Sequence, residues 1–308
     1  MKNYITIDGG TTNTKISIVS DGKIVDTLKT KSISDIENYK IIVREKINEL
    51  LKRNGYEEKD IIRILISGTM ATSEFGLYPL DYVVTPANIE MLKRESCEVI
   101  MPEISTIPFV VIRGVKTHGV SLDKVDAMRG EEAELAGIMS AHNEKCVYML
   151  MGSHSKIITT DDNGNIVDIC TMLSGELIEA VSKLTILKNS LVIEGNTLDS
   201  EYIKKGYNYC SKKGLNEALF KVRVLKNIFQ ETNSRIYSFF LGAILHGEVQ
   251  YILNSDAKKI VVGGNEFLKD AVTILLKEYV DGDIVCLSTE KVDSSVPIGL
   301  VKIYEYEL

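Results

Sequence analysis

The stretch Asp8-Gly9-Gly10-Thr11-Thr12-Asn13 joins two runs of alternating, β-branched sequence, Tyr4–Asp8 and Lys15–Ser20. The alternation predicts two strands with the glycine pair at the turn between them. A glycine pair lets the backbone approach a ligand closely, and successive N–H groups in such a turn can form an anion nest. Thr11 and Thr12 add hydroxyl donors, and Asp8 can hold Mg²⁺, usually through water. The stretch therefore predicts a phosphate and metal site, with an ordinary hairpin and a surface Asp as the alternative.

The same order of elements occurs twice along the chain. After the first turn, Asp21-Gly22 predicts a hairpin, because type I′ turns need positive φ at both central residues. A third strand and a helix follow. The second copy has its glycine turn at Gly152-Ser153 and its hairpin at Asn163-Gly164, again followed by a strand and a helix. A duplication of this kind predicts two similar lobes that face each other.

The division between the lobes is expected in the polar, irregular stretch Val115–Arg129, which would serve as crossing and hinge. The expected domains are then residues 1–116 and 117–296, with the tail 297–308 returning to the first lobe. A second long apolar pattern, from about Arg235 to Leu253, predicts one continuous buried helix.

The second glycine turn, Met151-Gly152-Ser153-His154-Ser155-Lys156, offers amides, two hydroxyls, an imidazole and an ammonium group. Phosphoryl transfer demands this kind of charge neutralisation. The alternatives are a structural hydrogen bond for His154 and a solvated surface position for Lys156. Gly263-Gly264-Asn265 reads as a strand-to-helix turn that could cradle a nucleotide at the helix N-terminus, or as a simple loop.

Arg129-Gly130-Glu131-Glu132 opens a helix, where acidic residues are favourable through the helix dipole alone. The functional interpretation is a general base that accepts the proton of an attacking hydroxyl. Adjacent helical residues point about 100° apart, so both glutamates cannot serve equally. Glu131 lies nearer the centre of the inward stripe, and Glu134 is expected to point away. Arg129 would suit a substrate carboxylate, because its planar fork matches both oxygens.

Composition excludes several classes of protein. The 308 residues carry a net charge of −7 with acidic and basic residues interspersed, which argues against nucleic acid as a partner. No P-loop, H-E-x-x-H or G-x-S-x-G motif occurs, so P-loop enzymes, zinc proteases and α/β-hydrolases are poor candidates.

The expected location is the cytoplasm. The five cysteines are widely spaced without a C-x-x-C pair, which favours a reducing compartment over disulfides or zinc. The N-terminal residues enter a strand pattern without a signal segment, and the longest apolar stretch, Ile236–Leu245, is too short to span a bilayer. No membrane partner is expected, and a homodimer is left open.

Four of these segments resemble the 2-dehydro-3-deoxygalactonokinase family of the acetate-and-sugar-kinase/Hsp70/actin superfamily. They span most of the chain in the family's order and are Ile7–Asn13, Met128–Glu132, Gly152–Lys156 and Met172-Leu173-Ser174-Gly175-Glu176-Leu177. The resemblance implies an α/β fold of two ribonuclease-H-like, actin-like ATPase lobes, each a mixed sheet flanked by helices, with an interlobe cleft.

The same resemblance implies an ATP- and Mg²⁺-dependent kinase that phosphorylates the C6 hydroxyl of 2-dehydro-3-deoxy-D-galactonate. Carried over by motif, Asp8 would meet the metal. The nucleotide would meet Asp8, Gly10, Thr11, Thr12, Asn13, Lys15, Gly152, Ser153, His154, Lys156, Gly263 and Gly264. Glu131 and Arg129 would be catalytic, and the sugar acid would contact Arg129, Glu132, Glu176 and Ser67.

The sequence departs from the family's usual pattern at three of these positions. The family usually has Trp at Gly9, Arg at Lys15 and Thr at Ser153. These departures bear on the substrate. The alternatives are a kinase of the same scaffold for another sugar acid or an amino sugar, and a non-catalytic ATP-binding sensor of the actin or chaperone type.

Overall fold

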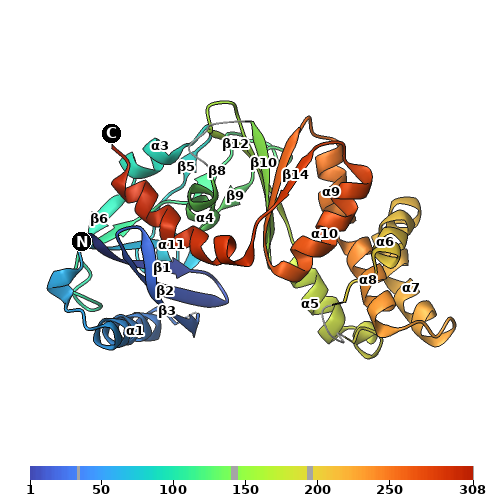
Figure 1. Ribbon diagram of the computed structural model, residues 1–308, viewed down its shortest axis with the longest axis horizontal. Coiled ribbons are helices and arrows are strands. Elements are labelled where there is room, and N and C mark those ends of the chain that lie inside the picture. Colours follow the sequence, from blue (N-terminus) through green and yellow to red (C-terminus); the bar gives the residue numbers. More distant parts are fainter. Residues whose placement is uncertain (33–34, 140–144, 193–196, 308) are drawn as a thin grey trace. The chain divides into compact units, whose positions relative to one another are not determined.

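The computed structural model describes residues 1–32, 35–139, 145–192 and 197–307. Within it the chain forms two compact units (Figure 1). The first comprises Met1–Glu144, Thr160–Ile169 and Glu290–Leu308, and the second comprises Lys145–Thr159 and Cys170–Thr289. The first unit is therefore longer than the expected lobe of residues 1–116.

The first unit is built on a six-stranded sheet in the order β3-β2-β1-β4-β7-β6. Strand β1 pairs antiparallel with β2 and parallel with β4, as expected of a hairpin followed by a helical crossover. A second, three-stranded sheet has the order β5-β8-β9. The strands are β1 (Asn3–Gly9), β2 (Asn13–Ser20), β3 (Lys23–Lys31), β4 (Arg63–Ser67), β5 (Val83–Val84), β6 (Cys97–Val99), β7 (Phe109–Val111), β8 (Val115–Lys116) and β9 (Ala127–Met128).

Helix α1 (Ile36–Asn54) packs its apolar stripe on this sheet. Its N-terminus is capped by Asp35, whose side chain accepts hydrogen bonds from two backbone N–H groups, and it ends at Gly55, which has φ 72°. Tyr39, Val43 and Ile47 are fully buried in the core below the strands. The other helical segments of this unit are η1 (Glu58–Asp60), α2 (Thr69–Thr72), α3 (Ile89–Arg94), α4 (Glu131–Ile138) and α11 (Thr289–Glu305).

Helix α11 lies on the side of strands β1–β3 opposite to α1 (Figure 1). It meets α4 at two glycines, where a Cβ on Gly137 would overlap the carbonyl of Ser295 and a Cβ on Gly299 that of Ala133. The Lys302 ammonium donates to the Ala136 carbonyl at 3.2 Å. Because only glycine permits this approach, α11 fixes the position of α4 on the sheet.

A five-stranded sheet in the order β12-β11-β10-β13-β14 repeats the arrangement of the first five strands of the six-stranded sheet, β3-β2-β1-β4-β7. As β1 does with β4, β10 pairs parallel with β13. The duplication read from the sequence is therefore confirmed as two sheets of the same strand order, the pattern of the actin-like ATPase fold. The strands are β10 (Cys146–Met151), β11 (Ser155–Thr160), β12 (Ile166–Met172), β13 (Lys259–Gly264) and β14 (Asp283–Cys286).

The helices of the second unit form its core with β10 and β13. Gly206 on α6 and Gly242 on α8 let these two helices touch, since a Cβ on either would overlap a carbonyl of the other helix. The helices are α5 (Ser174–Leu184), η2 (Ile186–Asn189), α6 (Ser200–Lys213), α7 (Leu215–Asn227), α8 (Asn233–Ile244), α9 (His246–Leu253) and α10 (Glu266–Tyr279).

Two expectations need correction. The continuous helix from Arg235 to Leu253 is broken at Leu245 into α8 and α9, which meet at 44°. The stretch Val115–Arg129 was expected to be an irregular crossing and hinge, but it contains the strands β8 and β9. These strands pair with each other and belong to the first unit. The hairpin expected at Asp21-Gly22 is confirmed, with φ 45° and 75° at its two residues.

Among the described residues, no single helix is long and apolar enough to cross a membrane. The bent pair α8 and α9 meets the criteria of length and composition only when its two halves are taken together.

Candidate active site

Asp8 stands at the end of β1, in register with Lys15 of β2 on one side and Ser67 of β4 on the other. Beyond it the chain turns through Gly10, Thr11 and Thr12, and both threonines are exposed. The Ser32 hydroxyl donates to the Gly10 carbonyl at 2.6 Å, and the Ser32 N–H donates to Thr12. These two bonds from Ser32 fix the carbonyl groups of the turn.

Three glycine backbones crowd together beside Asp8. Gly68 has φ 100°, and a Cβ on it would come within 2.6 Å of the Gly9 carbonyl oxygen. Gly130 has φ 110°, and a Cβ on it would lie 3.3 Å from the Gly68 Cα and 4.0 Å from Asp8 Oδ1. This packing brings the N-terminus of α4 next to the end of β1.

A cavity of about 90 Å³ opens at Asp8. It is lined by Thr6 and Asp8 of β1, Lys15 of β2, Glu134 of α4 and residues of α11. The expectation that Glu134 points away is therefore wrong. The physical reason is that α11 covers α4, so that six of the eight α4 residues are buried and the helix has no single inward stripe.

Two carboxyl groups of this cavity, those of Glu134 and Asp8, have a raised pKa. Burial, followed by the negative charges of Glu131 and Asp8, raises the pKa of Glu134 to about 8. Burial also raises the pKa of Asp8, against the opposing charge of Lys15. A cation beside Asp8 would offset the cost of ionising both groups, so these residues fit a Mg²⁺ ion held largely through water. Among the described residues, no group of three or more His, Cys, Asp or Glu side chains could ligate a metal directly.

Glu132 has a structural role rather than the expected contact with substrate. Its side chain is 1% exposed, and both of its oxygens accept from the Gly130 N–H, at 2.9 and 2.8 Å. Burial and the charge of Glu131 raise the pKa of Glu132 to about 8. Glu131 is only partly buried, and its Oε2 accepts from the Arg129 N–H at 3.0 Å.

Arg129 is held by protein on most of its guanidinium group. Nε donates to the Tyr82 hydroxyl at 2.9 Å, Nη1 donates to both oxygens of Thr72, and the group stacks 4.0 Å over the Tyr82 ring. Nε and Nη1 are both bonded to protein, and Nη2 has no hydrogen bond to a described residue. Arg129 can therefore donate to a ligand from Nη2 but cannot bind a carboxylate through two nitrogens. Ser67 is fully buried, and its hydroxyl likewise has no partner in the described ranges.

The second unit brings its own predicted residues together at the ends of β10 and β13. The Glu176 N–H, in the first turn of α5, donates to the Ser153 carbonyl at 3.0 Å, and a Cβ on Gly175 would overlap the Gly152 carbonyl. The turn therefore rests on the N-terminus of α5. His154 Nε2 lies 3.0 Å from Glu176 Oε1, so these two predicted site residues contact each other.

Lys156 and Gly264 also converge on this turn. Lys156 is 7% exposed and donates to Thr171 Oγ1 at 2.7 Å, which excludes the solvated alternative. Gly264 has φ 94° and is in register with Met151, and a Cβ on it would overlap the Met151 backbone. The next residue, Asn265, caps α10 by accepting from two backbone N–H groups. The turn at Gly263-Gly264 thus places a helix N-terminus beside the turn at Gly152.

Each unit therefore assembles one predicted set of residues. Asp8, Lys15, Ser67, Arg129 and Glu131 lie in the first unit, and the second holds Gly152, His154, Lys156, Glu176 and Gly264. The residue that the sequence missed is Glu134. The sequence places Glu134 one helical turn after Gly130, but helical spacing alone does not show which way its side chain points.

A family model described as 2-keto-3-deoxy-galactonokinase matches residues 8–293. A Sinorhizobium meliloti protein, provisionally assigned as a 2-dehydro-3-deoxygalactonokinase, has a structure similar to this one with a TM-score of 0.79, at 17% identity over 97% of each chain. Component A of the Acidaminococcus fermentans (R)-2-hydroxyglutaryl-CoA dehydratase matches with a TM-score of 0.53, at 12% identity over 98% of this chain and 97% of that one. No curated protein matches the chain.

Proposed function

Because the chain belongs to the 2-keto-3-deoxy-galactonokinase family, we propose that it transfers the γ-phosphoryl group of ATP to the C6 hydroxyl of 2-dehydro-3-deoxy-D-galactonate. Family membership makes the protein a sugar-acid kinase and implies the use of ATP. The identity of the sugar acid and the position of the hydroxyl are the proposal.

The observation that carries the proposal is the cavity that Asp8, Lys15 and Glu134 line beside an open glycine turn. Kinases work mainly by positioning and by charge neutralisation, so they need amide donors and cations around the phosphates and a carboxylate near the metal. Asp8 and the Gly10–Asn13 turn supply these groups in the first unit. In the second unit, the turns at Gly152–Lys156 and Gly263-Gly264 would bind the nucleotide.

Mg²⁺ would be held at Asp8 and would neutralise charge on the phosphates when bound. Lys15 lies across from Asp8 in the strand pair, so its ammonium adds a positive charge on the same side of the sheet. Lys156 is fixed by Thr171, which restricts its ammonium to one place.

Glu131 is our candidate for the general base. Glu131 is less buried than Glu132, the next glutamate of α4. Its negative charge contributes to the raised pKa of both Glu132 and Glu134. Those two groups hold protons near neutral pH, which makes them poor proton acceptors there. Arg129 Nη2 would contact the sugar-acid carboxylate, and Glu176 would contact a hydroxyl group. Ser67 is fully buried, so the contact with the sugar acid that was expected of it is not part of the proposal.

The test is ADP release, measured by a coupled assay with ATP and Mg²⁺, over a panel of 2-keto-3-deoxy sugar acids, amino sugars and hexoses. We expect the highest kcat/KM with 2-dehydro-3-deoxygalactonate. Faster turnover of a different sugar would reject the substrate but keep the reaction, and ATP binding without any sugar-dependent turnover would indicate a sensor instead.

The Glu131→Gln variant in the same assay tests the base. We expect kcat to fall at least about 100-fold with little change in KM, which is the scale of lost general-base catalysis. Near-normal kcat would exclude Glu131 from that role.

A further inference from the structure

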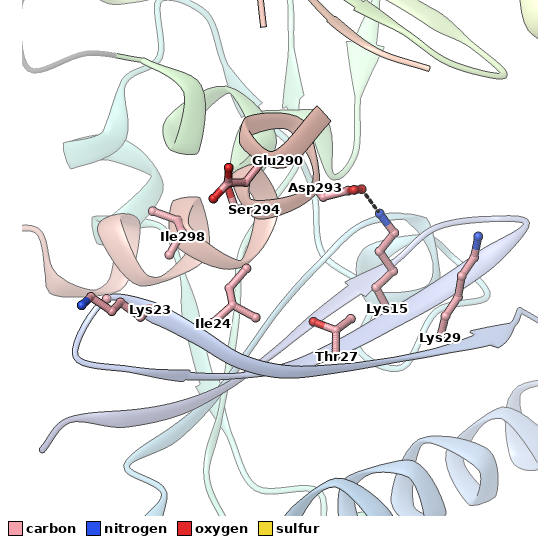
Figure 2. A pocket seen from close by; sticks show the side chains of 10 residues that line it. Lys15, Lys23, Ile24, Thr27, Lys29, Glu290, Asp293, Ser294 and Ile298 are labelled. Atoms are coloured by element: carbon pink, nitrogen blue, oxygen red, sulfur yellow. Dashed lines mark hydrogen bonds and ion pairs between the residues drawn. The ribbon is translucent and has the colours of Figure 1, made fainter. Parts of the chain in front are cut away.

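A larger pocket of about 760 Å³ lies wholly within the first unit, between the β2–β3 hairpin and the first turns of α11. Its volume falls in the range of about 300–1,000 Å³ that is typical of small-molecule sites. Figure 2 shows Lys15 and Lys29 side by side at one end of the hairpin, with Lys23 at the other end. Neither Arg129, Glu131 nor Ser67 lines it, so it is separate from the proposed sugar-acid contacts.

The charges in this pocket are only partly balanced. Lys15 and Lys29 are directly opposite partners in the β2–β3 register, a placement in which like charges repel. The positive charge of Lys15 is balanced by Asp293, whose Oδ1 lies 3.4 Å from the Lys15 ammonium. Lys29 and Lys23 form no ion pair with any residue in the described ranges. Glu290 also lines the pocket, which leaves one net positive charge from three lysines and two carboxylates.

The space between the two cationic ends suits a hydroxylated molecule. Ile24 on β3 and Ile298 on α11 form an apolar patch there (Figure 2). Thr27 and Ser294 flank it. The Thr27 hydroxyl shares a hydrogen bond of 2.8 Å with the Ser17 hydroxyl, and the Ser294 hydroxyl donates to the Lys291 carbonyl at 3.2 Å, so each keeps an oxygen that can accept from a ligand hydroxyl. A few polar groups around an apolar patch are what fixes the orientation of a small ligand.

We propose that this pocket is a second ligand site, which binds a small hydroxylated oxyanion, either a sugar acid or a sugar phosphate. The anionic group binds Lys29 together with Lys15, and the hydroxyl groups bind Thr27. A bound anion would reduce the repulsion between Lys15 and Lys29. Among the described residues, no acidic side chain forms an ion pair with Lys29.

The site is linked to the Asp8 cavity through shared residues. Lys15 and Asp293 line both spaces, so an oxyanion on Lys15 competes with Asp293 for the same ammonium group. The ligand would therefore draw the Lys15 ammonium away from the wall of the Asp8 cavity without occupying the substrate site.

The experiment uses the full chain with ¹³C-labelled isoleucine methyl groups, because Ile24 and Ile298 report from inside this pocket. The probes are inorganic phosphate, gluconate and glucose 6-phosphate, titrated separately while the methyl resonances are followed by NMR. We expect saturable shifts of Ile24 and Ile298 with at least one probe. Gluconate binding alone would assign a carboxylate ligand, and phosphate and glucose 6-phosphate binding would assign a phosphate ligand.

The decisive variant is Lys23→Gln/Lys29→Gln, with Lys52→Gln/Lys59→Gln as a control that removes the same charge elsewhere in the unit. We expect the dissociation constant to rise at least about tenfold in the first variant and to stay unchanged in the control. A lack of saturable shifts at Ile24 and Ile298, or equal affinity in both variants, would overturn the proposal. Because binding is read directly, this result does not depend on whether the chain phosphorylates a sugar acid.

Discussion

Asp8 and Glu134 share a small cavity with a single lysine, and the charge of that lysine cannot fully compensate for two partly buried carboxylates. The folded state therefore favours the protonated form of Glu134, whose pKa rises from 4.5 to about 8. Below pH 4.5 both the folded and the unfolded chain hold this proton. Between pH 4.5 and 8 only the folded chain does, so this group makes stability fall as the pH rises.

Replacing Glu134 by Gln removes that dependence. We expect the variant to be about as stable as the wild type near pH 4.5 and more stable by roughly 2 kcal/mol at pH 8.5. Each unit of pKa shift corresponds to about 1.4 kcal/mol, and solvent screening reduces the effect because Glu134 is only partly buried. Urea denaturation at a series of pH values measures the effect.

Glu45→Gln on the exposed face of α1 is the matched control and should leave the slope with pH unchanged. An equal pH dependence in Glu134→Gln and the wild type would show that the cavity does not suppress the ionisation of Glu134.

Sequence reasoning placed the candidate site residues at strand ends and helix starts but could not orient all of their side chains. Asp8 and the glycine turns were predictable, because strand ends and Asx-Gly hairpins have strong local signals. The roles of Glu132 and Glu134 were not, since they depend on α11, which packs on α4 from more than 150 positions further along the chain. Likewise, the partners of Arg129 are Thr72 at the end of α2 and Tyr82 just before β5, and no spacing rule connects these distant segments to it.

At the scale of elements, glycine contacts decide how the helices pack. Gly242 on α8 lies against the Ile203 carbonyl of α6, whereas the nearest atom to a Cβ on Gly247 of α9 would be the Met172 sulfur, at 3.4 Å. Both glycines lie in helices of the same unit, so they make a matched pair. The sequence did not predict the break between these helices at Leu245, because the apolar periodicity continues across it.

We expect Gly242→Ala to lower the free energy of unfolding by about 2–3 kcal/mol, because a backbone carbonyl cannot move aside as a flexible side chain can. Gly247→Ala should be neutral or stabilising by up to about 1 kcal/mol, from helix propensity. Urea denaturation followed by far-UV circular dichroism distinguishes the two. Equal losses in both variants would mean that α6 and α8 are not in tight contact.

At the scale of the whole molecule, the first unit is discontinuous in sequence. Helix α11 returns after all of the second unit and supplies Leu300 and Ile303 to buried positions, while the Tyr4 hydroxyl donates to Glu305 at 2.9 Å. The second unit has a separate core around Phe240 and Leu275. Each core should therefore respond separately to damage.

Deleting residues 290–307 tests this separation by hydrogen exchange and mass spectrometry. We expect amides of β1, β2 and β4 to lose protection, because the deletion uncovers the face of the sheet that α11 occupies, while those of α6 and α8 keep theirs. Loss of protection throughout both units would contradict the independence of the two cores.

The late position of α11 also has a consequence for synthesis. After strand β4, a ribosome makes strands β5 to β9 and helix α4 and then the second unit before it reaches the helix that covers the first sheet. During that interval of some 200 residues, at about 5–20 residues per second, the face of β1 and β2 that carries Asp8 waits without its cover. All residues of the second unit are synthesised before Glu290 and the rest of α11. The second unit can therefore complete its fold before the first unit, although the first sheet is translated earlier.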